Sequence, residues 1–232
     1  MGFWDRWLWE LGFAICHQRM DRLLLFGDRP LFVCARDTGI FVSFFALLLA
    51  LSLLRGEKRA GMPPLSVNLL CLAGVLFLGW EGLTSNLGWR ESTNLLRFLS
   101  GTAGGVGFAV PVAALMNREV WGGDASRRIM GGARDLLFAS AVLPIALVVY
   151  LLRPAPLFRV AQLGLLASIL GTIWSLNLLL ISLLKPRRRE GALNARFATA
   201  FLFLALELAA SYGLHRILTG EGPVFWAIAV FH

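Results

Sequence analysis

Charged residues are scarce in this sequence. Only 16% of its 232 residues are Asp, Glu, Lys or Arg, and 57% are hydrophobic, whereas a soluble domain is about a quarter charged and about half apolar. Familiar catalytic motifs are also missing: the sequence has no nucleotide-binding loop, no CxxCH haem motif and no serine-hydrolase elbow. The composition argues against a soluble protein, and the missing motifs argue against those three enzyme classes.

The apolar residues are arranged in long runs, which is typical of membrane proteins. A helix needs about 20 mostly apolar residues to cross a bilayer, and backbone groups inside lipid must be hydrogen-bonded internally. We therefore predict an all-α, polytopic transmembrane bundle with six spans, at residues 39–54, 65–83, 96–117, 136–152, 160–184 and 197–215. In the third span Gly101 and Gly105 form a GxxxG motif, which permits close contact between helices.

The ends of the chain differ from the spans. Asp5 and Glu10 interrupt the first apolar residues, so no cleavable signal peptide is expected. The three tryptophans between residues 3 and 15 suit the headgroup zone, and we predict an interfacial amphipathic helix there. The predicted organisation is an N-terminal segment (1–38), the transmembrane bundle (39–217) and a short apolar tail (218–232).

The net charge of +8 comes from basic residues spread over short loops. This pattern predicts membrane topology and contact with anionic lipid headgroups, and it does not suggest nucleic-acid binding. Outside the N-terminal segment, Lys and Arg concentrate around 55–64, 118–135 and 185–196. The positive-inside rule then places these loops in the cytoplasm. We expect a protein of the cell's inner (plasma) membrane with an extracytoplasmic N-terminus.

Cysteine and histidine are rare, with three of each, yet Cys16, His17 and Cys34 all lie near the N-terminus. Cys34 and Asp37 have the two-residue gap of a zinc knuckle, and 17 residues separate Cys16 from Cys34. Cys16, His17, Cys34 and Asp37 therefore predict a site for zinc or another divalent transition metal ion. The side chains of adjacent residues point in different directions, so Cys16 and His17 could bind the same ion only in a turn. His215 is therefore an alternative metal ligand to His17. A Cys16–Cys34 disulfide, catalytic thiol chemistry and inert buried thiols are the other interpretations.

A second polar segment joins spans two and three. Arg90, Asn94 and Arg97 share one face if the third helix reaches back to Arg90, and they would then form a binding site for an anionic substrate. Alternatively Ser92, Thr93 or Asn94 is the N-cap, and Arg90 lies in the loop. In that alternative the arginines reach toward the interface, and Glu81 pairs with one of them.

The motifs CHQ (16–18), VCARDTGI (33–40) and GLTSNLGWRESTNLLRFLSG (82–101) resemble a family of predicted bacterial and archaeal membrane proteins, domain of unknown function 2085. The resemblance covers residues 16–105 and implies a site on Cys16, His17 and Cys34. The resemblance does not imply any particular biochemical activity. Asp37 stands where the family usually has a third cysteine, so a strict three-thiol site is not expected. Glu81 stands where the family usually has Asp.

The last span carries a polar stripe. Glu207, Ser211 and His215 are spaced by four residues, and Asn177 in the fifth span is a possible partner. Glu207 and Glu81 are the candidates for moving a proton in catalysis. The alternative interpretation is a structural hydrogen bond between helices.

Three functional hypotheses fit these features. The first is a membrane metalloprotein whose metal site lies beside the arginine cluster and which acts on a lipid-linked or phosphorylated substrate. The second is a transporter or lipid translocator with Glu207 and His215 in a polar path. The third is a non-catalytic accessory subunit stapled by a Cys16–Cys34 disulfide. The sequence leaves open whether the protein is an enzyme.

Overall fold

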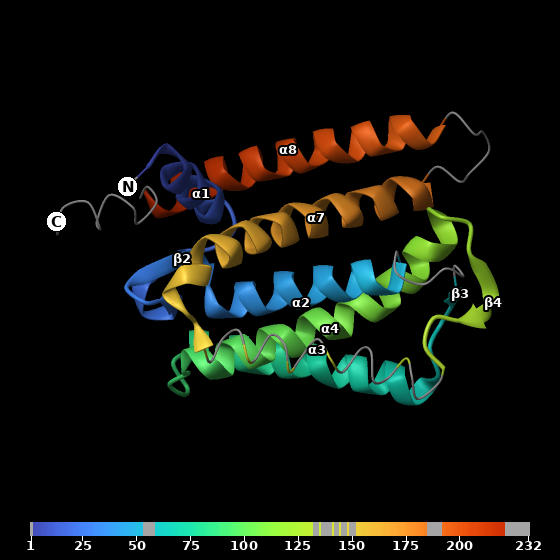
Figure 1. Ribbon diagram of the computed structural model, residues 1–232, viewed down its shortest axis with the longest axis horizontal. Coiled ribbons are helices and arrows are strands. Elements are labelled where there is room, and N and C mark those ends of the chain that lie inside the picture. Colours follow the sequence, from blue (N-terminus) through green and yellow to red (C-terminus); the bar gives the residue numbers. More distant parts are fainter. Residues whose placement is uncertain are drawn as a thin grey trace.

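The computed structural model describes residues 2–52, 59–131, 152–184 and 192–220, and residues 135, 141, 144 and 148 (Figure 1). Its helices are α1 (Phe3–Phe13), α2 (Ala35–Ser52), α3 (Leu65–Asn86), α4 (Asn94–Glu119), α7 (Phe158–Leu184) and α8 (Ala192–Thr219). A 3₁₀ turn at Met20–Arg22 precedes the first strand, and another at Ala155–Leu157 precedes α7. The strands are β1 (Leu23–Phe26), β2 (Arg29–Cys34), β3 (Arg59–Gly61) and β4 (Asp124–Arg128).

Five helices in the described ranges are long and apolar enough to span a membrane, namely α2, α3, α4, α7 and α8. The predicted all-α polytopic bundle is confirmed. The predicted span 136–152 lies mostly outside the described residues, as do the basic segment 185–190 and most of the C-terminal tail. Within the described part, α4 ends and α7 begins at opposite ends of the bundle (Figure 1).

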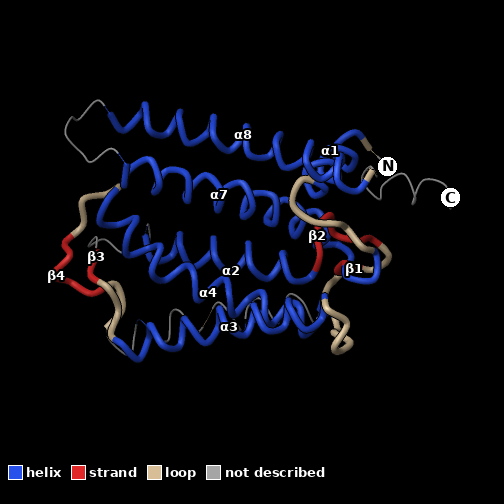
Figure 2. The backbone as a smooth tube through the Cα atoms, turned by 180° about the vertical axis from the view of Figure 1, so that it is seen from behind, coloured by secondary structure: helices blue, strands red, loops and turns tan. Residues whose placement is uncertain are grey.

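Two short sheets, which the sequence did not predict, lie at opposite ends of the helices (Figure 2). β1 and β2 form an antiparallel hairpin with the pairs Leu25–Pro30 and Phe26–Arg29. Its tight turn contains Gly27 at φ 62°, a conformation that glycine adopts without strain. Since β2 runs to Cys34, α2 begins at Ala35 and not at residue 39.

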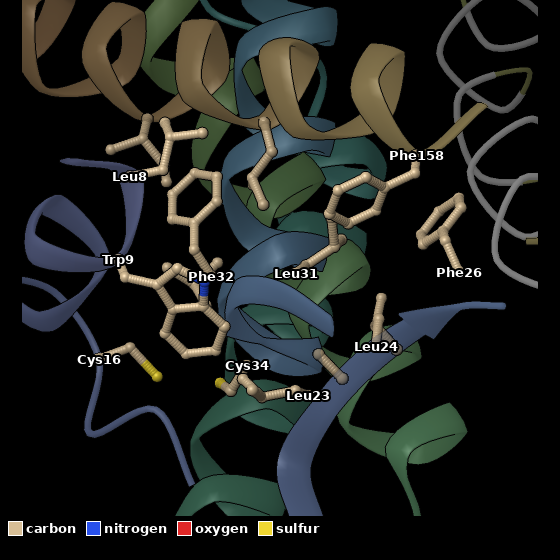
Figure 3. Packing of buried hydrophobic residues seen from close by; sticks show 14 of the residues in the cluster. Leu8, Trp9, Cys16, Leu23, Leu24, Phe26, Leu31, Phe32, Cys34 and Phe158 are labelled. Atoms are coloured by element: carbon tan, nitrogen blue, oxygen red, sulfur yellow. The ribbon is translucent and has the colours of Figure 1, made fainter. Parts of the chain in front are cut away.

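Helix α1 packs inward along one face. Trp9 is only 1% exposed and joins Leu8 and Phe32 in a core that includes Phe158 of α7 (Figure 3). The prediction that all three tryptophans suit the headgroup zone is therefore wrong for Trp9. Trp4 and Trp7 lie on the other face of α1 and are exposed, because the helix presents only one side to β2 and α7.

The glycines of α4 allow α2 to approach closely. A Cβ atom at Gly101 would overlap the carbonyl oxygen of Arg36, and one at Gly105 would overlap the hydroxyl of Ser43. Ser43 bridges the two helices, because its hydroxyl donates to Gly39 O at 2.7 Å and lies 3.1 Å from Thr102 O. The predicted GxxxG contact is confirmed, and its partner is α2.

An ion pair fixes α1 to α7, and we expect it to make stability depend on pH. The Asp5 carboxylate accepts hydrogen bonds from Arg159, with Nη2 at 3.1 Å, and this bonding lowers the pKa of Asp5 below its ordinary 3.8, although burial opposes the shift. A carboxyl group whose pKa is lowered by folding stabilises the folded state above its unfolded pKa. That contribution is lost as the pH falls through the folded pKa.

The test compares thermal unfolding of the wild-type protein and Asp5→Asn from about pH 7 to about pH 3. Because the Arg159 side chain is half exposed, the difference at neutral pH should be about 1 kcal/mol or less. It should shrink below about pH 4. A difference in stability between the two proteins that stays constant from about pH 7 to about pH 3 would contradict the prediction.

Candidate metal centre

Three ligand-type side chains converge at the N-terminal end of α2. Cys16 follows the turn after α1, Cys34 is the last residue of β2, and Asp37 lies in the first turn of α2. The two Sγ atoms and a carboxylate oxygen all lie within 4.8 Å of one another, and the Cys34 thiol donates to Asp37 Oδ2 at 3.1 Å. Figure 3 shows the two sulfur atoms on facing segments. Three separate elements thus supply one compact donor set.

Gln18 holds this arrangement in place. It is fully buried, and its Nε2 donates to Trp9 O at 2.8 Å and to Phe32 O at 2.9 Å. Its backbone lies in the left-handed region with φ 50°, which is uncommon for a residue other than glycine. Gln18 therefore ties α1 to β2 and turns the chain so that Cys16 faces Cys34. No role for Gln18 was predicted from the sequence, although Gln18 belongs to the CHQ motif.

The close packing disfavours negative charge on the Cys34 thiol. The hydrogen bond with Cys16, burial and the charge of Asp37 together raise the pKa of Cys34, in that order of size. The backbone N–H of Asp37 acts in the opposite direction. The thiolate is the form of cysteine that binds metals. A divalent cation would offset the repulsion between a Cys34 thiolate and the Asp37 carboxylate.

His17 lies apart from this donor set. Its ring contacts His215 edge-on, with the ring centroids 4.5 Å apart, and His215 stacks on Phe13. His215 Nδ1 is also 2.6 Å from Phe13 O. Among the described residues no histidine joins the group of Cys16, Cys34 and Asp37. His215 thus reaches the N-terminal segment through His17 and Phe13, but it does not take the place of His17 in the donor set.

Cys16 and Cys34 are free thiols in this structure. They line a cavity of about 490 Å³ together with the Asp37 carboxylate. The other residues that line the cavity are Ile15, His17, Gln18, Arg19, Arg22, Arg36 and Asn86. Basic side chains thus surround the donor set.

Glu81 is fully buried and organises the neighbouring polar network. Its carboxylate lies 2.6 Å from Nη2 of Arg36 and accepts hydrogen bonds from the hydroxyls of Ser92 and Ser100. Arg90 Nη2 lies 3.7 Å away. The predicted pairing of Glu81 with an arginine of the second polar segment thus occurs with Arg90, but the closer partner, Arg36, was missed. The role of Glu81 in proton transfer stays a prediction.

The segment 90–97 adopts the second of its two predicted arrangements. Helix α4 begins at Asn94, and the Thr93 hydroxyl caps it by accepting from Leu96 N–H at 3.2 Å. Arg90 therefore lies in the loop before α4. The prediction that Arg90, Asn94 and Arg97 share one helix face is wrong. Asn94 donates to Asp21 O and Leu23 O.

Arg97 takes part in the same local network. It is 8% exposed, and its Nη1 donates to Asn94 Oδ1 at 3.1 Å. Among the described residues, those that line the cavity do not include Arg90, Asn94 or Arg97. The anion-binding role of these three residues stays a prediction.

The polar stripe of α8 connects helices. Asn177 donates to Glu207 Oε2 at 2.9 Å, as the sequence suggested. The Ser211 hydroxyl donates to Ala14 O, and the Tyr212 hydroxyl donates to Glu10 Oε2 at 2.8 Å. These contacts fasten α8 to α7 and to α1. A catalytic or transport role for Glu207 stays a prediction.

Comparison with known proteins identifies a family. Residues 16–110 match a family described as predicted membrane proteins, DUF2085. An uncharacterized protein of Methanothermobacter thermautotrophicus is 35% identical over 96 residues, which are 41% of this chain and 82% of that protein. The chain belongs to the DUF2085 family. No solved structure matches it significantly. The DUF2085 match includes Cys16, Cys34, Asp37 and Glu81, whereas α7 and α8 lie beyond it.

Proposed function

We propose that this multi-pass membrane protein binds a divalent transition metal ion, zinc in the first instance, through Cys16, Cys34 and Asp37. The observation that carries the proposal is the spacing of the three donor atoms, all within 4.8 Å of one another. Zinc binds sulfur at about 2.3 Å and carboxylate oxygen at about 2.0–2.2 Å in tetrahedral sites. Ligand atoms of such a site lie about 3.5 Å apart, so small side-chain movements would complete it.

Three protein ligands leave the fourth tetrahedral position for water or substrate, as in catalytic zinc sites. The donor set borders a cavity, which gives such a ligand room. A metal ion placed there would act as a Lewis acid or activate water. Metal-assisted chemistry on a lipid-linked or phosphorylated substrate is the activity that this arrangement favours.

We also propose that the metal centre faces the outside of the inner (plasma) membrane. Arg59, Arg127 and Arg128 line a cavity of about 300 Å³ beside the β3–β4 sheet, at the opposite end of the bundle (Figure 2). Basic residues concentrate on the cytoplasmic side of membrane proteins. The end that carries β3 and β4 is therefore the cytoplasmic end in this proposal.

The test measures metal content per chain in detergent-purified protein and counts free thiols in the same sample. We expect about one zinc per wild-type chain and essentially none in Cys34→Ser, because the loss of one of three ligands removes most of the affinity. Cys71→Ser is the matched control, since Cys71 lies in the middle of α3 and outside the donor set. It should retain the metal.

The opposite outcome would support a different role. Folded protein without metal, in which two thiols are missing from the count, would indicate a Cys16–Cys34 disulfide. The cysteines would then stabilise the N-terminal segment, as in the accessory-subunit hypothesis, by about 3 kcal/mol for a loop of this length.

A further inference from the structure

The cavity beside the donor set is lined by three guanidinium groups. Arg19 lies before β1, Arg22 ends the 3₁₀ turn before that strand, and Arg36 lies in the first turn of α2. Arg19 pairs with Asp21 at 3.3 Å, and both of these side chains are more than half exposed. Such a pair is weak in water, so it leaves Arg19 available to another anion.

Arg22 offers a donor without an acceptor. Its side chain is 20% exposed, and its Nη1 donates to Asn86 Oδ1 at 3.0 Å. Its Nε is buried and makes no hydrogen bond within the described part of the chain. The carboxylate of Asp21 is 3.9 Å from that Nε, which is too far for a hydrogen bond. A buried N–H group without an acceptor is unfavourable, and a small rotation of the Arg22 side chain would turn it toward an oxyanion in the cavity.

Arg36 is held in position at the cavity by its other contacts. Its Nε donates to Glu81 Oε2 at 2.8 Å, and its Nη2 donates to Ser85 Oγ at 2.9 Å. These bonds fix the plane of the guanidinium group. A planar group that is already oriented loses little freedom when it binds an oxyanion.

The cavity lies where the spans end. Asn86 is the last residue of α3, and Arg36 and Asp37 belong to the first turn of α2. Helices that cross a bilayer end near the headgroups, which is the level of the lipid phosphates. The volume of about 490 Å³ falls within the usual range for ligand sites and exceeds what a bare phosphate needs.

We propose that this cavity binds a phosphate group, with Arg19, Arg22 and Arg36 as its ligands. Guanidinium groups bind phosphate oxygens through paired, charge-assisted hydrogen bonds. The inference rests on the proposed function to the extent that it sets the phosphate beside the metal ion, where the ion polarises a phosphoryl oxygen. It moves the anion site from Arg90, Asn94 and Arg97 to the segment that carries the cysteines. Free phosphate and a lipid phosphate share this chemistry.

The experiment titrates inorganic phosphate into zinc-loaded, detergent-purified protein by calorimetry and measures zinc per chain in every variant. Arg22→Gln is expected to retain zinc and to bind phosphate at least about tenfold more weakly, because a charge-assisted hydrogen bond is lost. Arg29→Gln is the matched control. It removes the same charge from the nearby hairpin but does not line the cavity, so it should bind phosphate as the wild type does.

Equal phosphate affinity in the wild type and Arg22→Gln, or no binding at all, with zinc retained, overturns the phosphate site and leaves the metal centre standing. Wild-type protein that binds no zinc but binds phosphate through Arg22 overturns the metal centre and supports the phosphate site. If Arg22→Gln does not fold, Arg22→Lys takes its place, because lysine keeps the charge but loses the paired geometry. It should also weaken binding.

Nanodiscs identify the source of the phosphate. They are made from phosphatidylcholine alone or from phosphatidylcholine with phosphatidic acid, and the titration is repeated in both. Weaker apparent binding of inorganic phosphate in the presence of phosphatidic acid, absent in Arg22→Gln, shows that a lipid phosphate occupies the site. Equal binding in both nanodiscs shows a site for soluble phosphate.

Discussion

Replacing Glu81 by alanine is expected to destabilise the protein by about 3–5 kcal/mol, because the change leaves a buried guanidinium group without its counter-ion. Glu81 is fully buried, and the Arg36 side chain is only 15% exposed at a separation of 2.6 Å. The hydroxyl of Ser100 would lose its acceptor as well. The loss should affect α2, α3 and the start of α4 together, since these elements meet at the carboxylate.

The measurement is thermal unfolding in detergent. Glu91→Ala is the control, because Glu91 lies in the same region but is exposed, and surface changes usually alter stability by less than about 0.5 kcal/mol. Glu81→Asp should be milder than Glu81→Ala, since it keeps the charge. The prediction fails if Glu81→Ala unfolds at the same temperature as Glu91→Ala.

Replacing Gly101 by leucine is expected to separate α2 from α4. Even a Cβ atom alone at this position would overlap the carbonyl oxygen of Arg36. That oxygen belongs to the backbone and cannot rotate away. Overpacking of an interior costs about 1–3 kcal/mol and occasionally more. The upper end applies here, because two long helices must move. The shift would also disturb Arg36, which lies on α2 between the cysteine site and Glu81.

Gly79→Leu provides the matched control for this change. Gly79 lies in a spanning helix, and an added Cβ there has nothing within 4 Å. The measurement is the unfolding temperature and the yield of monodisperse protein in detergent. Gly101→Leu should lower both, whereas Gly79→Leu should leave both near the wild-type values. Equal behaviour of the two variants would contradict the close contact between α2 and α4.

The membrane architecture could be predicted from the sequence because its signal is local. A run of about 20 apolar residues predicts a span regardless of what packs against it, and the described spans differ from the predicted ones mainly at their ends. The GxxxG motif predicted close packing for the same reason, because small side chains permit it. The sequence could not choose the partner helix, and the structure shows that it is α2.

The hairpin and the buried position of Trp9 escaped prediction because both depend on distant residues. The β1–β2 strands are short and apolar, so their pattern resembles that of a helix end. Trp9 is buried because it lies in a core that Phe32 and residues of α7 share. The local sequence of α1 does not indicate that Phe32 or α7 will pack near Trp9.

The sequence by itself determined that this is a multi-pass helical membrane protein of the DUF2085 family, with Cys16, Cys34 and Asp37 inside the region that matches the family. Only the tertiary structure decided that these three side chains converge without His17, and that Arg36 is a closer partner of Glu81 than Arg90 is. The physical reason is that spans follow from the hydrophobicity of neighbouring residues. A site depends on the directions of side chains from separate elements, and packing fixes those directions.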